Sequence, residues 1–303
     1  MNERTAKPRD AEIFSKELPA AKSGLFRIAG DLPVRRLGFG AMRITGKGVW
    51  GPPQDHDECI RVLRRTIELG INFIDTADSY GPDVSERLIA EALHPYPDGL
   101  VIATKAGFDR PGRDQWTMNG RPEHLRQACE GSLRRLKLER IDLYQLHRID
   151  PQVPAEDQLG TLKDLATQGK IRHIGLSEVT VAEIKQARTI VPIASVQNRY
   201  SVADRAAEDV LEYCERESMG FIPWFPLGAG KLVEKGGKLE RTAAEMRIST
   251  PQLALAWLLW RSPVMLPIPG TSRASHLEEN VAAAAVKVDD RKMEELGQKA
   301  KSA

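Results

Sequence analysis

The chain alternates between amphipathic stretches with helical spacing and short apolar runs that have the character of buried strands. Three of the amphipathic stretches are followed within two residues by a glycine and then by an apolar run. A glycine just after a helix accepts the left-handed backbone conformation that ends it, and the chain then enters a strand. These stretches and their glycines are 61–69 with Gly70, 162–168 with Gly169, and 210–218 with Gly220.

Further apolar runs bring the expected strands to eight, with helices between most of them. Successive parallel strands need such crossovers, so the alternation indicates either a (β/α)₈ barrel or a doubly wound sheet. A doubly wound dinucleotide-binding domain expects a complete Gly-x-Gly-x-x-Gly turn, and Gly38-Phe39-Gly40 supplies only its first half. We therefore predict an α/β protein with a (β/α)₈ TIM barrel, preceded by a hairpin around Gly30-Asp31. The expected strands are 38–42, 71–74, 100–104, 141–146, 171–176, 193–197, 221–224 and 264–268.

The barrel is expected to fill most of the chain. Residues 1–23 are polar, contain Ala and Pro, and show no clear period, so a flexible extension is predicted there. Residues 24–303 are then expected to form a single barrel domain, since a chain of 303 residues is an ordinary length for this fold.

Composition and charge narrow the kinds of protein to which this chain can belong. Hydrophobic residues at 41% and charged residues at 28% are typical of a globular protein with a sizeable core. The net charge of +2 provides no overall field for nucleic acid, and the basic cluster 134–140 interleaves with leucines as a solvated helix end does. No apolar run approaches the roughly 18 residues of a membrane span, and no signal-peptide core is present. Because Cys59, Cys129 and Cys214 are isolated, we expect no disulfide framework, no metal site and a cytoplasmic location.

Four ionisable side chains follow predicted strands. In a barrel the carboxyl ends of the strands meet at one face, which is where active sites lie. Reduction of a carbonyl by a hydride leaves an alkoxide that needs a proton, and a free tyrosine, with a pKa of about 10, is a poor donor unless its surroundings change it. A nearby ammonium favours the phenolate, an aspartate keeps that ammonium charged, and a neutral histidine polarises the carbonyl. Each residue alone has an ordinary structural explanation, but the four together predict one active site. They are Asp75, Tyr80, Lys105 and His147.

The same segments resemble the aldo-keto reductase family. The pattern runs through 73–81, 103–105 and 143–147 and continues in the family's order as far as Asn280. The resemblance implies a reductase that transfers a hydride from NADPH, or alternatively NADH, to an aldehyde, with the four residues above as its catalytic tetrad and Tyr80 as proton donor. It also implies the cofactor-binding residues Met42, Ser177, Gln197, Trp224, Phe225, Pro226, Leu227, Gly228, Gly270, Thr271, Ser272, Arg273, Glu279 and Asn280.

Within this resemblance, Ser177 and Gln197 hold the nicotinamide carboxamide and Trp224 stacks on the nicotinamide ring. Two positions depart from the family's pattern. Glu178 stands where Asn is frequent, and an ionised carboxylate accepts hydrogen bonds but does not donate them. Phe225 replaces a frequent serine and offers less polar contact.

The segment 270–280 is expected to hold the adenosine end of the cofactor. It leads into a helix, whose N-terminus attracts phosphate. Arg273, with His276 as a helper, is the candidate partner of a 2′-phosphate, which favours NADPH. The competing explanation is that Ser275 and Glu278 form a capping box and that Arg273 is simply exposed.

In the segments 40–43, 48–55 and 225–228, the chain looks most like the pyridoxal reductase (pyridoxine 4-dehydrogenase) branch of the family. Trp50 and Trp116, in loops near the site, are the expected walls of a pocket for a flat aromatic aldehyde such as pyridoxal. Two other functions stay open: a cofactor-binding redox sensor or scaffold like the potassium-channel β subunits, and a cofactor-free isomerase or lyase that uses Lys105 as a Schiff base. Neither nucleic acid nor membrane is an expected partner.

Overall fold

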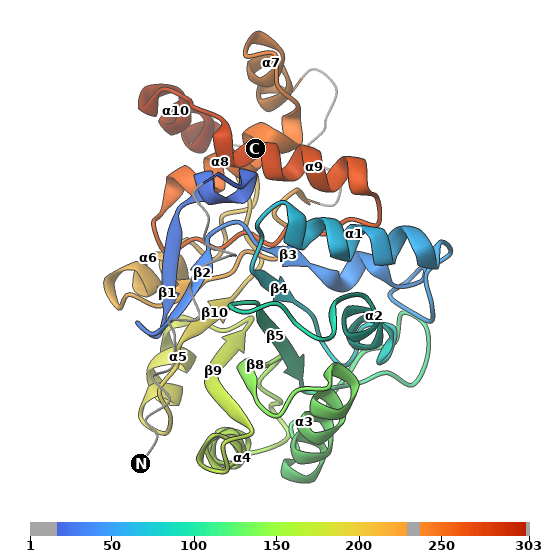
Figure 1. The fold of residues 1–303 in the computed structure, drawn as a ribbon. Helices are drawn as coiled ribbons and strands as arrows, with labels where there is room; N and C mark the ends of the chain where they lie inside the picture. The colour runs from blue at the N-terminus through green and yellow to red at the C-terminus, as the bar shows by residue number, and fades with distance from the viewer. Residues whose placement is uncertain (1–16, 229–236, 301–303) are drawn as a thin grey trace, which may run out of the picture.

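The computed structural model describes residues 17–228 and 237–300. Its centre is a curled sheet of seven parallel strands with helices around it (Figure 1). Each strand lies beside its predecessor, as in a barrel whose strands are joined by helical crossovers. In sheet order the strands are β3 (Phe39–Gly40), β4 (Phe73–Asp75), β5 (Val101–Ala106), β8 (Ile141–Leu146), β9 (Ile171–Ser177), β10 (Ser195–Gln197) and β11 (Gly220–Phe221).

Residues 264–269 fill the eighth position and close the barrel between β11 and β3. Met265 forms a parallel bridge with Phe221, and on the other side the Gly38 N–H donates to the Pro267 carbonyl at 2.9 Å. The expectation of a regular strand at 264–268 is wrong, because Pro267 and its neighbour Pro269 have no N–H to complete a ladder. The (β/α)₈ barrel prediction is confirmed, with an eighth strand of irregular form.

The predicted N-terminal hairpin is present as β1 (Leu25–Ile28) and β2 (Leu32–Arg35), paired antiparallel. Asn72, just before β4, pins it to the barrel. Its Oδ1 accepts the Arg35 N–H at 2.8 Å, and its Nδ2 donates to the carbonyls of Pro33 and Gly99 at 3.1 and 3.0 Å. Apolar hairpin residues join residues of the barrel strands in one buried cluster, so the hairpin closes that end of the barrel.

The start of the folded region differs from the prediction. Residues 1–16 of the expected extension lie outside the described residues. Pro19–Ser23, however, form a short 3₁₀ helix, η1, in which Ala20 and Ser23 are buried. The Ala20 N–H donates to the Leu69 carbonyl at 3.0 Å. Residues 19–23 of the expected extension are therefore packed on the barrel through the buried Ala20.

The helices surround the strands, and α7 and α10 lie at one end beside α8 (Figure 1). The predicted glycine stops hold at Gly70 and Gly169, with φ of 85° and 74°. At the third stop the prediction is wrong: Gly220 lies within β11, and Ser218 takes the left-handed conformation with φ of 54°. The helices are η2 (Ala41–Ile44), α1 (His56–Glu68), α2 (Val84–Leu93), α3 (Pro122–Leu136), α4 (Ala155–Thr167), α5 (Val181–Arg188), α6 (Glu208–Arg216), α7 (Lys238–Glu245), α8 (Thr250–Arg261), α9 (Ala274–Ala282), η4 (Ala283–Ala285) and α10 (Asp290–Ala300).

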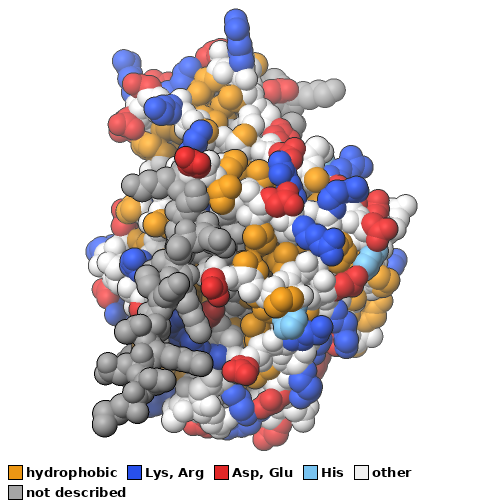
Figure 2. Space-filling view, viewed as in Figure 1, with side chains coloured by type: hydrophobic (Ala, Val, Ile, Leu, Met, Phe, Trp, Pro, Cys, Tyr) orange, Lys and Arg blue, Asp and Glu red, His pale blue; other side chains and the backbone are white. Residues whose placement is uncertain are grey.

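The cysteines and the surface charges are arranged as in an ordinary globular protein. Cys59, Cys129 and Cys214 are free and buried. Lys and Arg side chains intermingle with Asp and Glu on the face in Figure 2, so no region of one charge dominates there. Within residues 17–228 and 237–300, no helix is both long and apolar enough to cross a membrane.

Candidate active site

The four predicted site residues meet at the carboxyl ends of the strands. Asp75 is the last residue of β4, and Lys105 lies near the end of β5. Tyr80 is in the loop after β4, and His147 directly follows β8. Lys105 is 0% exposed, and its Nζ lies 2.6 Å from Asp75 Oδ1, 2.7 Å from the Thr76 carbonyl and 3.4 Å from Tyr80 Oη. The lysine thus links a carboxylate to the phenol inside the protein.

Two glutamines complete the surroundings of Asp75. The side-chain amides of Gln145 and Gln197 each donate to Asp75 Oδ2 at 2.9 Å. The sequence prediction did not include Gln145; the available signal was its place one residue before the end of β8, on the same side of the strand as Leu143. Gln197, assigned by resemblance to the carboxamide, contacts the carboxylate instead through its NH₂ group. Its Oε1 accepts no hydrogen bond that involves the described residues.

Burial controls the protonation of the site. Burial raises the pKa of Tyr80, and Lys105 opposes this without cancelling it. The expectation that the lysine would favour phenolate is therefore outweighed by desolvation. Burial lowers the pKa of Lys105, but Asp75 and Tyr80 outweigh it and the net shift is upward. Burial, reinforced by Lys105 and Arg148, holds the pKa of His147 well below its usual value. At neutral pH the phenol is protonated, the lysine charged and the imidazole neutral.

His147 faces a cavity that holds the rest of the site. Its Nδ1 lies 3.4 Å from Ser79 Oγ, and if Nδ1 accepts that hydrogen bond, Nε2 is the nitrogen that carries the proton. The cavity has a volume of about 640 Å³. Predicted residues in its lining are Asp75, Tyr80, His147, Met42, Ser177, Gln197, Trp224, Phe225, Pro226, Leu227, Gly270 and Trp116; residues not predicted are Gly40, Arg43, Phe108, Arg148, Ile268 and Pro269.

Aromatic rings form one wall of this cavity. Trp116 packs edge-to-face on Tyr80, Phe108 and His147, with ring centroids 6.5, 5.4 and 6.3 Å apart. Phe108 belongs to a small hairpin, β6 (Phe108–Asp109) and β7 (Thr117–Met118), that presents Trp116 to the cavity. Trp116 thus lines the cavity that also holds Tyr80 and His147, and its contact with a substrate stays a prediction.

Trp50 does not line the cavity; an arginine separates it from Trp116. The guanidinium of Arg110 lies 3.6 Å from the Trp116 ring and 5.5 Å from the Trp50 ring. Arg110 also donates to the carbonyls of Ser79 and Val49 at 2.7 and 3.1 Å. Trp50 therefore lies on the other side of the Arg110 guanidinium from Trp116, and its part in a substrate pocket stays a prediction.

A second group of residues holds the indole of Trp224. Glu178 Oε1 accepts the Trp224 Nε1–H at 2.5 Å and the Arg199 backbone N–H at 2.6 Å. The carboxylate therefore positions the indole, which answers what Glu178 does in place of Asn. Nearby, the backbone turn 225–228 is closed by the Gly228 N–H, which donates to the Phe225 carbonyl at 2.9 Å.

The segment 270–273 borders a second cavity, of about 780 Å³, that shares Arg43 with the first. Ser272 and Arg273 line it, while Thr271 is buried and its Oγ1 accepts the Arg273 N–H at 3.1 Å. Asn280 is buried, and Glu279 is half-buried; neither lines either cavity. The two cavities together run from the four predicted site residues to the start of α9.

The α9 N-terminus is capped from another helix. Arg273 is the N-cap and supplies no capping side chain. Instead, Glu58 of α1 accepts the Ala274 N–H at 2.8 Å, and this hydrogen bond, with help from Arg61, lowers the pKa of Glu58. Glu278 pairs with Arg65 at 2.8 Å. The alternative of a Ser275–Glu278 capping box is therefore wrong, because a carboxylate distant in sequence takes that place.

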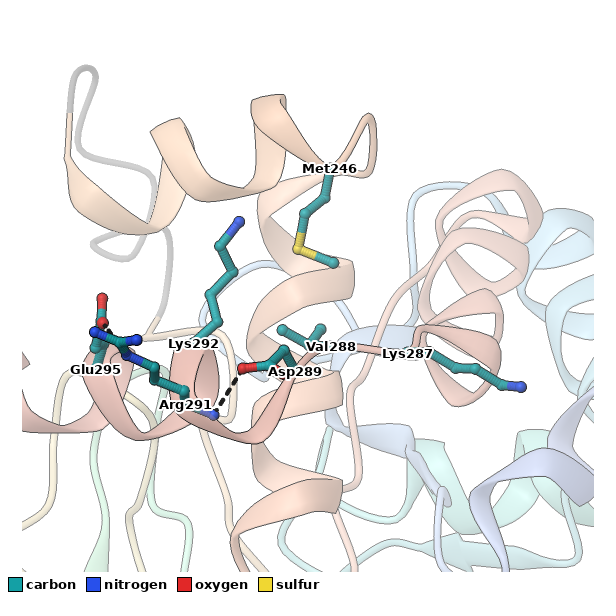
Figure 3. Close-up of a pocket in the computed structure, with 7 residues that line it drawn as sticks. All are labelled: Met246, Lys287, Val288, Asp289, Arg291, Lys292 and Glu295. Atoms are coloured by element: carbon teal, nitrogen blue, oxygen red, sulfur yellow. Dashed lines mark hydrogen bonds and ion pairs between the residues drawn. The ribbon is translucent and has the colours of Figure 1, made fainter.

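A separate groove, away from these two cavities, carries mainly charged side chains. Figure 3 shows a groove of about 380 Å³ where α10 approaches the end of α7, lined by Met246 and by charged residues of 287–295. Its charges pair locally: Arg291 lies 3.6 Å from Glu295, and Lys292 lies 3.3 Å from Glu245. In the part of the chain that the structure describes, no three His, Cys, Asp or Glu residues are grouped to hold a metal ion.

Comparisons with known proteins agree with this geometry. The family model described as the aldo/keto reductase family matches residues 36–301. An uncharacterized oxidoreductase of Schizosaccharomyces pombe is 51% identical, over 95% of this chain and 94% of its own. Pyridoxine 4-dehydrogenase of Escherichia coli is 42% identical, over 84% of this chain and 91% of its own. An aldo/keto reductase of Klebsiella pneumoniae, solved in complex with NADP and acetate, superposes with a TM-score of 0.76 at 25% identity, covering 90% of this chain and 94% of that one.

Proposed function

The chain belongs to the aldo/keto reductase family, and on this premise we propose that it reduces aldehydes with NADPH, with Tyr80 as the proton donor. As a member of that family it is an oxidoreductase that uses a nicotinamide cofactor. The observation that carries the finer proposal is the buried chain from Asp75 through Lys105 to Tyr80, open at Tyr80 and His147 to the central cavity.

Each residue has a chemical task in this proposal. When bound, a reduced nicotinamide supplies a hydride to the carbonyl carbon. His147, neutral because its pKa is depressed mainly by burial, donates a hydrogen bond to the carbonyl oxygen without giving up its proton. Tyr80 gives that oxygen its proton, and the Lys105 ammonium, 3.4 Å away, stabilises the negative charge left on the phenolate. Asp75 keeps the lysine charged and in place.

The residues that would hold the cofactor fit its chemistry. Ser177 and Gln197 offer a hydroxyl and an amide oxygen for a carboxamide, and Trp224 offers an indole face for a planar ring. Arg273, exposed at the second cavity, is the proposed partner of the 2′-phosphate. The Klebsiella relative bound to NADP supports NADPH over NADH.

Pyridoxal is the proposed candidate substrate. The support is the similarity to pyridoxine 4-dehydrogenase together with the wall of Phe108, Trp116 and Tyr80, which suits a flat aromatic ring. The product would be pyridoxine.

The test compares wild type with Tyr80→Phe. Wild type is expected to oxidise excess NADPH over many turnovers when pyridoxal or an aryl aldehyde is added. Tyr80→Phe keeps the ring and its packing, so cofactor binding should persist while the reduction rate falls by roughly 10²–10⁴, the scale of general acid catalysis. A near wild-type rate in the variant removes Tyr80 from this role. Cofactor binding without multiple turnovers in wild type would favour the sensor or scaffold function.

A further inference from the structure

Arg148 is a cation of the central cavity that the proposed reaction does not use. It directly follows His147 and lines the same cavity. Its Nη1 donates to the His147 carbonyl at 2.5 Å and to Ser177 Oγ at 3.0 Å. Its Cζ lies 5.7 Å from the centre of the Phe108 ring, so the guanidinium sits at the edge of the aromatic wall.

Most of its donors are open to the cavity. A guanidinium has five N–H groups, and the two hydrogen bonds above both come from Nη1. Among the described residues, Nε and Nη2 donate to nothing, yet neither is a buried atom lacking a partner. These groups therefore face space that a ligand or solvent can reach.

No carboxylate neutralises this charge. Within residues 17–228 and 237–300, Arg148 makes no ion pair. Asp75 is the one acidic residue in the cavity lining, and Lys105 already pairs with it. The charge of Glu178 acts on Arg148, but that carboxylate is held by the Trp224 indole and by the Arg199 backbone.

Arg110 shows what a structural arginine at this site looks like. Its Nη1 and Nε atoms donate to three backbone carbonyls within 3.1 Å, those of Ser79, Val49 and Gln115, and its face is covered by Trp116. The Nε and Nη2 groups of Arg148 have no such carbonyl partners among the described residues. A partly buried guanidinium with open donors is a costly arrangement unless an anion completes it.

We propose that Arg148 binds an ionised oxygen of the substrate, so that the preferred substrates are aldehydes that carry a carboxylate or similarly ionised group. This inference rests on the proposed function, because it assumes that the carbonyl lies at Tyr80 and His147. The phenolic oxygen of pyridoxal, when ionised, belongs to the same class. The planar guanidinium of Arg148 can donate two parallel hydrogen bonds to a carboxylate. Hydrogen bonds to a neutral ester are weaker.

The test uses matched pairs of substrates. The 2-, 3- and 4-carboxybenzaldehydes are compared with their methyl esters, so that no distance between aldehyde and carboxylate is assumed. For at least one isomer, wild type should prefer the acid in kcat/KM by about 10- to 150-fold, the range of one charge-assisted hydrogen bond. Arg148→Met should reduce that ratio to near one, and Arg148→Lys should restore part of it. Arg43→Met, which removes the other guanidinium of the cavity lining, should leave the ratio in place.

A binding measurement separates this inference from catalysis. Calorimetric titration of NADP-loaded wild type and Arg148→Met with 4-(hydroxymethyl)benzoate and its amide should show a loss of affinity for the acid alone. Equal losses for acid and amide, or a weakened affinity for NADP, would assign Arg148 to Ser177 and the cofactor and overturn the inference. Wild type that reduces acids and esters equally also overturns it, whereas failure to reduce any aldehyde defeats the proposed function itself.

Discussion

The buried pair of Lys105 and Asp75 provides the sharpest test of how the site is built, through the substitution Lys105→Met. Methionine approximates the length of lysine but has no charge. The change removes the donor to Asp75 Oδ1 at 2.6 Å, to the Thr76 carbonyl at 2.7 Å and to Tyr80 at 3.4 Å. Asp75 keeps the two glutamine amides on Oδ2 but loses the ammonium with which it pairs.

The expected cost in stability follows from burial. Removing one partner of a buried ion pair leaves an uncompensated charge, which costs about 3–5 kcal/mol. With about 2–4 °C lost per kcal/mol for a domain of this size class, Tm should fall by roughly 6–20 °C. The double substitution Lys105→Met with Asp75→Asn removes both charges and should recover at least half of the lost free energy of unfolding. Chemical denaturation of wild type, both single variants and the double variant measures this coupling.

Activity should respond differently from stability. Both Lys105→Met and the double variant leave Tyr80 without its cation, so both should reduce aldehydes roughly 10²–10⁴ times more slowly than wild type. A double variant as unstable as Lys105→Met would mean that lost packing, not the stranded carboxylate, sets the cost. An active Lys105→Met enzyme would refute the role of the ammonium beside Tyr80.

Two further predictions concern pH and cofactor choice. Burial is the main cause both of the raised pKa of Tyr80 and of the lowered pKa of His147, so the phenol stays protonated up to at least its ordinary pKa of about 10, and the imidazole stays neutral down to at least about 6.5. The kcat for reduction should therefore be flat between roughly pH 7 and 9, and a clear inflection inside that window, measured under saturating substrates, would contradict the assigned protonation states. Arg273→Ala should weaken NADPH binding by about 10- to 150-fold while NADH binding changes little, because a charge-assisted contact to the 2′-phosphate is lost. Tryptophan fluorescence titration at low and high salt checks this; equal losses for both cofactors would make Arg273 a support of its loop.

The barrel and the meeting of Asp75, Tyr80, Lys105 and His147 at one face could be predicted from sequence, because their signals are local. Apolar runs after glycine stops define strands, and ionisable residues at strand ends must meet at one face whatever the details of the loops. The same local signals failed where the rest of the fold determines the conformation of the backbone. Gly220 looked like a helix stop, but Ser218 accepts that conformation and the glycine enters β11.

Contacts between distant residues could not be predicted from spacing. Glu58 caps α9 from a position 216 residues earlier, and Arg110 inserts between Trp50 and Trp116, which come from separate loops. Arg148 and Phe108, which line the central cavity, were not among the predicted site residues either. An arginine next to a catalytic histidine or a phenylalanine after a strand has many ordinary explanations, and only the arrangement of the cavity reveals them.

Glu178 shows how a departure from a family pattern acquires a structural reason. Its backbone is left-handed, with φ of 55°, and Phe225 is also left-handed with φ of 59°. Each such conformation costs a non-glycine residue on the order of 1–3 kcal/mol, so the surroundings must hold it. The carboxylate of Glu178 bonds both the Trp224 indole and the Arg199 backbone, and the Phe225 ring packs edge-to-face on Trp224 at 5.1 Å. The two strained residues thus both contact the same indole. Asparagine is one methylene shorter than glutamate and would not be expected to reach the Trp224 indole from the same backbone position, which ties the unusual residue at 178 to a preset orientation of Trp224.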